Sequence, residues 1–100
     1  MSDISFVILN YNGYKETARL IESLMKWNRR NLDFNIVIVD NCSSDDSFDR
    51  LRADFNQIEY IDVIKSWHNG GYSYGNNFGA KYAMIWSPKV LAMTPITSNY

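Results

Sequence analysis

The sequence is poor in cysteine and has no leader-like start. Its single cysteine, Cys42, excludes an internal disulfide. Small secreted domains usually depend on disulfides, because they bury only a modest core. The first four residues, Met-Ser-Asp-Ile, also lack the basic and apolar regions of a signal peptide. Together these absences predict a cytoplasmic location.

Long apolar runs and an excess of one charge are also absent. No apolar run approaches the roughly 18 residues of a membrane-spanning helix. Ten basic and 11 acidic residues are interspersed, giving a formal net charge of −1, so we expect no nucleic-acid or anionic-membrane partner. A hydrophobic content of 46% argues against disorder. These features predict one small folded domain, residues 1–100, with no membrane span.

Four short apolar runs predict β-strands. The clearest is Ile-Val-Ile-Val at 36–39, whose four β-branched residues are too few for a helix and are typical of a strand buried on both faces. Glu59 and Asp62 interrupt the third run, which predicts a less buried strand at a sheet edge. The predicted strands are Ile4–Leu9, Ile36–Val39, Ile58–Ile64 and Val90–Met93.

Helical patterns lie between these strands. Tyr14–Trp27 separates an apolar face from a charged one, and Ser47–Phe55 has apolar residues at helical spacing. A third helix is predicted after the loop Trp67–Asn77 and runs to about Ile85. The resulting order, β-α-β-α-β-α-β, predicts an α/β fold with a mostly parallel, Rossmann-like sheet.

Polar loops follow the first three strands, so they should meet at the carboxyl edge of the sheet, where open α/β sheets bind ligands. Asp40 is the first candidate, because it emerges directly from the central strand. The loops offer an aromatic ring, a carboxylate and several amides, which suit a base and a ribose. The candidate binding residues are Asn10, Tyr11, Asn12, Asp40, Asn41, Asn69, Gly70, Gly71, Asn76 and Asn77.

Known phosphate motifs do not fit the glycine-rich loop. Gly70 and Gly75 have the spacing of a P-loop, but Asn76 and Asn77 stand where Lys and Ser or Thr are required. No G-x-G-x-x-G follows the first strand, as a dinucleotide-binding fold would need. No residue is predicted to be a catalytic nucleophile or a metal ligand.

Structural roles compete with the binding roles. Asp40 could cap the turn that follows it, since Asp is common before a helix. Asp45 and Asp46 suit the start of a helix better than a ligand site. Tyr11 could pack under the first helix, and Asn76 and Asn77 could belong to a helical first turn. The sequence leaves these alternatives open.

Three motifs, taken in order, resemble the N-terminal part of the family 2 glycosyltransferases of GT-A fold, in particular the rhamnosyltransferase-like branch. They are Val-Ile-Leu-Asn-Tyr-Asn-Gly at 7–13, Ile-Val-Ile-Val-Asp-Asn-Cys-Ser-Ser-Asp-Asp-Ser at 36–47 and Asn-Gly-Gly-Tyr-Ser-Tyr-Gly-Asn-Asn-Phe-Gly at 69–79. The resemblance implies a UDP- or dTDP-linked sugar as partner. Tyr11 and its neighbours would contact the base, Asp40 the base or ribose, and residues 69–77 the nucleotide and sugar.

The end of the chain departs from that family. An acidic motif that binds Mg²⁺ or Mn²⁺ is expected after the fourth strand, but Thr94-Pro95-Ile96-Thr97 has no carboxylate. The catalytic base and the acceptor-binding half would lie beyond residue 100. We therefore expect a truncated, N-terminal part of a glycosyltransferase that is inactive alone and self-associates. The alternative is a non-catalytic α/β module that binds a nucleotide or a protein.

Overall fold

The computed structural model describes residues 4–27, 33–66 and 89–93. The described elements, in chain order, are β1 (Ile4–Asn10), α1 (Tyr14–Trp27), β2 (Phe34–Asn41), α2 (Ser47–Phe55), β3 (Ile61–Ser66) and β4 (Lys89–Met93). Neither of these two helices is long and apolar enough to cross a membrane. The predicted third helix and the loop Trp67–Asn77 lie outside the described residues.

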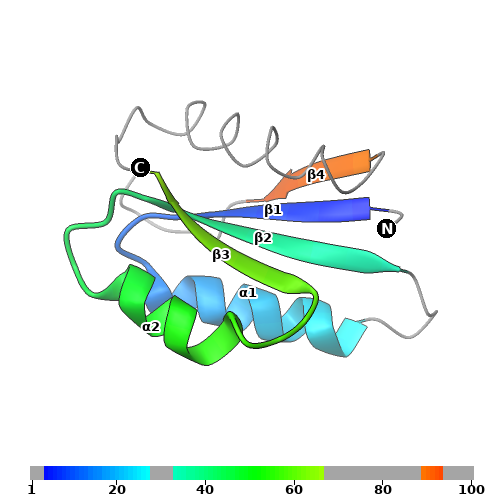
Figure 1. The fold of residues 1–100 in the computed structure, drawn as a ribbon, viewed down its shortest axis with the longest axis horizontal. Helices are drawn as coiled ribbons and strands as arrows, with labels where there is room; N and C mark the ends of the chain where they lie inside the picture. The colour runs from blue at the N-terminus through cyan, green and yellow to red at the C-terminus, as the bar shows by residue number, and fades with distance from the viewer. Residues whose placement is uncertain (1–3, 28–32, 67–88, 94–100) are drawn as a thin grey trace.

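The strands form one parallel sheet in the order β3-β2-β1-β4 (Figure 1). This arrangement confirms the predicted α/β class and the central place of β2, all eight residues of which are buried. Both α1 and α2 cover the same face of the sheet (Figure 1). Parallel strands need a crossover between them, and α1 and α2 supply the crossovers from β1 to β2 and from β2 to β3.

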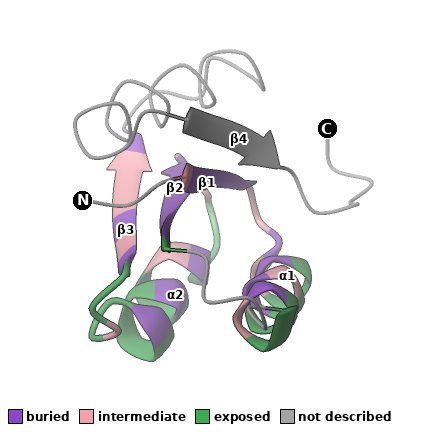
Figure 2. Cartoon of the chain, turned by 90° about the vertical axis from the view of Figure 1, so that its right-hand side faces the viewer, coloured by how far each residue is buried: buried purple, intermediate pink, exposed green. Residues whose placement is uncertain are grey.

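Side chains alternate between the two faces of the sheet, so each central strand contributes to two apolar clusters. The buried sides of the helices face the sheet in Figure 2. On that face Ile8 and Ile38 pack in one cluster with Ile21 of α1 and Leu51 of α2. A second buried cluster lies on the opposite face and consists of Val7, Leu9, Val37 and Val39. The burial of both faces explains why β1 and β2 are almost continuously apolar.

The third strand begins later than predicted. Residues 56–60 form turns after α2, with the Ile58 N–H donating to the Phe55 carbonyl and the Ile61 N–H to the Ile58 carbonyl (both 3.0 Å). The predicted start at Ile58 is wrong because Ile58 is apolar for another reason: it packs against the core from the turn. The predicted edge position is confirmed, because β3 is the outermost strand on its side of the described sheet.

A side chain of the preceding turn occupies part of this edge. The backbone N–H of Val63 in β3 donates to Asn56 Oδ1 at 3.2 Å. Unpaired edge groups of this kind invite pairing with other chains, and natural proteins commonly cover them. Asn56 therefore accepts a hydrogen bond from one backbone N–H group on the outer edge of β3, and that group is no longer open to pairing with another chain.

One buried polar pair lies on the sheet face opposite the helices. Ser5 of β1 and Asn35 of β2 are partners in the strand register, and the Ser5 hydroxyl donates to Asn35 Oδ1. Ser5 has no exposed surface and Asn35 is 9% exposed. Because a buried polar group is costly without a partner, this hydrogen bond makes the polar positions compatible with the surrounding core.

Tyr14, the first residue of α1, connects the two helices. Its hydroxyl donates to the Asp54 carboxylate of α2, and the Arg50 guanidinium lies over its ring, 3.9 Å from the centroid. The pKa of Tyr14 is raised from its ordinary value of 10.0, mainly by the hydrogen bond to Asp54 and further by burial and the charge of Asp54; Arg50 opposes the shift. The neutral hydroxyl is thus the stabilised form.

Replacing Tyr14 by Phe should lower the free energy of unfolding by about 0.5–1.5 kcal/mol near neutral pH, the usual net worth of a hydrogen bond. Because the folded-state pKa is raised, this contribution is fully present below pH 10 and is lost as the pH rises through the folded-state pKa. Urea unfolding at about pH 8 and about pH 11 measures both values. Tyr60→Phe is the control, and a difference from wild type that is no smaller at the higher pH would contradict this account.

Candidate functional site

The structure brings the predicted residues of β1 and β2 together at the carboxyl edge of the sheet. Asn10 and Asp40 are register partners at the ends of adjacent parallel strands. Both are buried: Asn10 is 1% exposed, and neither Asp40 nor Asn41 has any exposed surface. The remaining predicted residues, Asn69, Gly70, Gly71, Asn76 and Asn77, lie outside the described residues.

Hydrogen-bond donors from the end of β1 and from the loop after β2 converge on the Asp40 carboxylate. Its Oδ1 accepts from Asn10 Nδ2 at 2.9 Å and from the Ser43 hydroxyl at 2.6 Å. Its Oδ2 accepts from the Ser43 backbone N–H at 3.0 Å. Such bonds offset the desolvation of a buried carboxylate, which would otherwise cost several kcal/mol. Asp40 therefore organises the turn after β2, the structural role that the sequence also allowed.

The backbone of that turn is bent at Cys42, which has a φ of 59°. A residue with a side chain adopts this left-handed conformation only at a cost, of order 1 kcal/mol. The bend lies between Asp40 and Ser43, and the Ser43 N–H returns to the carboxylate two positions before Cys42. The hydrogen bonds to Asp40 thus hold Cys42 in place, and its thiol is half-buried.

Asn12 joins the loop after β1 to the loop after β2. Its Oδ1 accepts from the backbone N–H groups of Ser44 and Asp45, at 2.9 and 3.2 Å. Its own backbone N–H donates to the Ser43 hydroxyl at 2.9 Å. Asn12 has a φ of 49°, a region that asparagine tolerates better than most residues. The two loops are consequently one hydrogen-bonded unit.

Asp45 has the helix-start role that competed with ligand binding. Its Oδ1 accepts from the Ser47 N–H at 2.9 Å, at the first residue of α2. Asp46 occupies the N-cap position but forms no side-chain capping hydrogen bond. Both carboxylates are exposed and suit the positive end of the helix dipole.

The predicted residues differ in how much surface they offer. Tyr11 and Asn12 are half-buried at the rim, whereas Asn10, Asp40 and Asn41 lie beneath it.

Sequence reasoning missed two members of the site, Ser43 and Thr17. Thr17 is 1% exposed and its hydroxyl donates to Asn10 Oδ1 at 2.6 Å. Its place on the apolar face of α1, four residues before Ile21, is the signal that could have revealed it.

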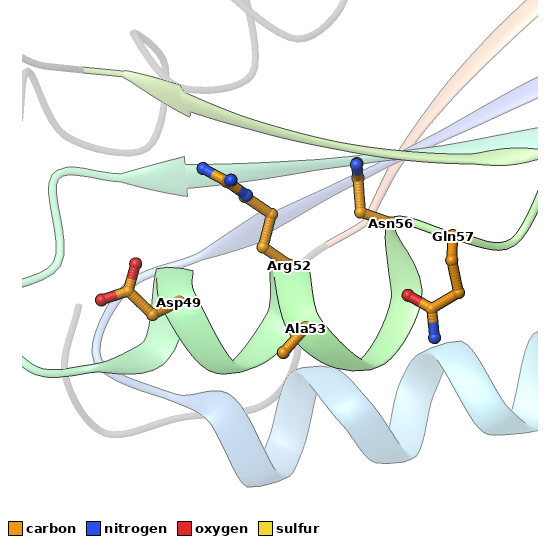
Figure 3. A pocket seen from close by; sticks show the side chains of 5 residues that line it. All are labelled: Asp49, Arg52, Ala53, Asn56 and Gln57. Atoms are coloured by element: carbon orange, nitrogen blue, oxygen red, sulfur yellow. The ribbon is translucent and has the colours of Figure 1, made fainter.

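A separate surface hollow lies on α2 and in the turn after it. It is lined by Asp49, Arg52, Ala53, Asn56 and Gln57 (Figure 3). No predicted binding residue lines it, and Asn56 is already engaged with the edge of β3. The hollow is therefore distinct from the carboxyl edge, which remains the candidate site.

Comparison with known proteins agrees with this architecture. Residues 5–84 match the family model described as Glycosyl transferase family 2. The chain belongs to this family. The hexosyltransferase Agl10 of low-salt glycan biosynthesis in Haloferax volcanii is 33% identical over 84 residues, which make up 84% of this chain and 24% of that protein.

Two solved structures share the fold. Residues 1–349 of S. aureus TarS give a TM-score of 0.72 at 25% identity, covering 92% of this chain and 27% of that one. The mannosyltransferase PcManGT of Pyrobaculum calidifontis, solved with GDP-Man and Mn²⁺, gives 0.69 at 14% identity, covering 83% and 26%. These similarities confirm the expected GT-A fold. The chain spans about a quarter of the length of these relatives.

Asn12→Gly should loosen the loop pair without straining the backbone, because glycine accepts a φ of 49° and removes only the amide. We expect a loss of about 1 kcal/mol in unfolding free energy and faster hydrogen exchange at the Ser44 and Asp45 amides. Asn12→Ala should cost about 1 kcal/mol more, since alanine is strained in this region. Unchanged exchange at both amides in Asn12→Gly would show that Asn12 does not hold the loops together.

Proposed function

We propose that this chain supplies the nucleotide-sugar-binding part of a glycosyltransferase that transfers a hexose from a nucleotide-diphosphate donor to an acceptor hydroxyl. The observation that carries the proposal is the joined pair of loops above Asp40, at the carboxyl edge of β1 and β2. Ligands of open α/β sheets bind at this edge. Membership of glycosyl transferase family 2 and the hexosyltransferase relative support the same reaction class.

In this proposal the rim and the floor of the site have different tasks. Tyr11, a half-buried residue of the loop after β1, would offer an aromatic face to the nucleobase. Asn12 would contact the nucleotide from the rim, Asn41 would support the site from beneath it, and Asp40 fixes the floor on which base and ribose would rest. Residues 69–77 are proposed to face the nucleotide and the sugar. A cytoplasmic setting and a role in polysaccharide biosynthesis belong to this proposal.

The chemistry of transfer also requires groups that these residues do not provide. An acceptor hydroxyl needs a general base within hydrogen-bond reach, and the departing diphosphate needs stabilisation. We assign no catalytic base within the described part of the chain. The proposed contribution of this part is therefore donor binding and orientation, which lowers the barrier by fixing the reacting groups in place.

A divalent cation does not fit the described residues. They contain no group of three or more His, Cys, Asp or Glu side chains that could hold a metal ion. Asp40 uses both carboxylate oxygens for hydrogen bonds from Asn10 and Ser43. Mg²⁺ and Mn²⁺ require several hard oxygen ligands. Mn²⁺ is present in the PcManGT complex, and the role proposed for the described residues of this chain needs no metal ion.

We predict that the chain binds UDP or dTDP weakly, with a dissociation constant of about 1 mM, equivalent to about −4 kcal/mol. Asp40→Asn should weaken this binding, because an amide cannot accept all the bonds that the carboxylate accepts. Asp40→Ala removes the side chain altogether. Glu59→Gln is the charge-matched control at the amino edge of the sheet, where the side chain is exposed. Ligand-observed NMR titrations that give equal affinities for all four proteins would remove Asp40 from the site.

We further predict that saturating Mn²⁺ or Mg²⁺ tightens nucleotide binding by less than about tenfold, since the described carboxylates form no metal cluster. The measurement is the same titration with and without the cation, after treatment of the protein with a chelator. A larger gain would show that a metal site exists elsewhere in the chain.

A further inference from the structure

Thr17 places a hydroxyl on the otherwise apolar buried face of α1. It is 1% exposed, and its neighbours on that face, Ala18, Ile21 and Leu24, are all buried. A hydroxyl in such surroundings is costly unless it is hydrogen-bonded. Its donor bond of 2.6 Å goes to Asn10 Oδ1 at the end of β1. The hydroxyl thus connects the helix to the floor of the candidate site.

This bond determines which way the Asn10 amide faces. An ionised carboxylate only accepts hydrogen bonds, so Asn10 must turn its Nδ2 toward Asp40, as it does at 2.9 Å. Its Oδ1 must then find a donor in a region where Asn10 is only 1% exposed. The Thr17 hydroxyl is that donor. Without it, the amide would either keep a buried acceptor unsatisfied or rotate and present its oxygen to the carboxylate.

The orientation is transmitted to the loops. Asn10 and Asp40 meet Ser43, whose hydroxyl donates to Asp40 Oδ1 at 2.6 Å and accepts the Asn12 backbone N–H at 2.9 Å. Each bond in this series has only one workable direction, because the carboxylate accepts and the backbone N–H donates. The spacing of the two loops therefore depends on a buried residue of α1.

We propose that Thr17 is a positioning residue for the donor site, which acts through Asn10 and Asp40 to hold the 11–13 and 42–46 loops at the spacing that binds a nucleoside diphosphate. The proposal rests on the proposed function. Thr17 would touch no ligand atom, and its effect would come entirely from the hydroxyl rather than from the volume of its side chain.

Three variants separate the hydroxyl from general stability. Thr17→Val keeps the β-branched shape but removes the donor, and Thr17→Ser keeps the donor but removes the methyl group. Ile21→Val is the matched control, since Ile21 lies one turn further along the same buried face and the change lowers stability through packing alone. Titration of each chain with UDP, dTDP and GDP, followed by protein NMR at a temperature where all are folded, measures affinity. Thermal melts give the stability of each variant.

We expect Thr17→Val to weaken binding at least fivefold and Thr17→Ser to stay within twofold of the wild-type affinity. Ile21→Val should leave the affinity unchanged even if its melting temperature falls as much as that of Thr17→Val. The side-chain amide signals of Asn10 should shift or broaden in Thr17→Val only.

Equal affinities for Thr17→Val and wild type would overturn the positioning role alone. If Ile21→Val weakens binding as much as Thr17→Val, the effect is one of stability and the positioning role is likewise overturned. Absence of nucleotide binding by the unsubstituted chain would overturn the proposed function, and with it any part for Thr17 in donor binding.

Discussion

The carboxyl edge of this sheet is organised by the burial of one carboxylate. Asp40 follows four apolar residues of β2 and has no exposed surface, so its charge must be satisfied by hydrogen bonds from the protein. Asn10 and Ser43 supply these bonds, and meeting that demand fixes the path of the chain after both central strands. The left-handed conformation of Cys42 and the bond from Asn12 to Ser43 follow from it. The loop geometry is thus a consequence of supplying the buried Asp40 carboxylate with hydrogen bonds from the protein itself.

Much of the fold could be predicted from the sequence because local pattern and tertiary burial agree. The helix boundaries at Tyr14, Trp27, Ser47 and Phe55 were correctly predicted, since each helix has one clear apolar face. The start of β3 was not, because Ile58 is apolar for a reason other than strand formation: it packs under a turn. Pattern alone cannot distinguish these two uses of a buried isoleucine.

The candidate site was only partly predictable for a different reason. Asn10, Asn12 and Asp40 stand out in the sequence, since polar residues directly after apolar strands are conspicuous. Thr17 and Ser43 do not, because their importance comes from contacts with residues that lie 7 and 3 positions away, respectively, and from the direction of each hydrogen bond. These contacts matter because they complete the hydrogen bond between Asn10 of β1 and Asp40 of β2, which lie 30 positions apart and meet only once the strands are paired. The loop 69–77 contributes to the prediction but not to the described geometry.

The two buried polar pairs between β1 and β2 also bear on how the chain finds its fold. Ser5 with Asn35 and Asn10 with Asp40 are register partners five positions apart, one pair on each face of the sheet. Moving β2 by one residue against β1 would place its apolar and polar side chains on the wrong faces and separate both pairs at once. Two separated buried pairs would each cost about 1–3 kcal/mol per unsatisfied group. The polar residues thus disfavour misaligned pairing of the central strands. Asn10 and Asp40, which form the floor of the candidate site, therefore also favour the correct register of β1 and β2 during folding.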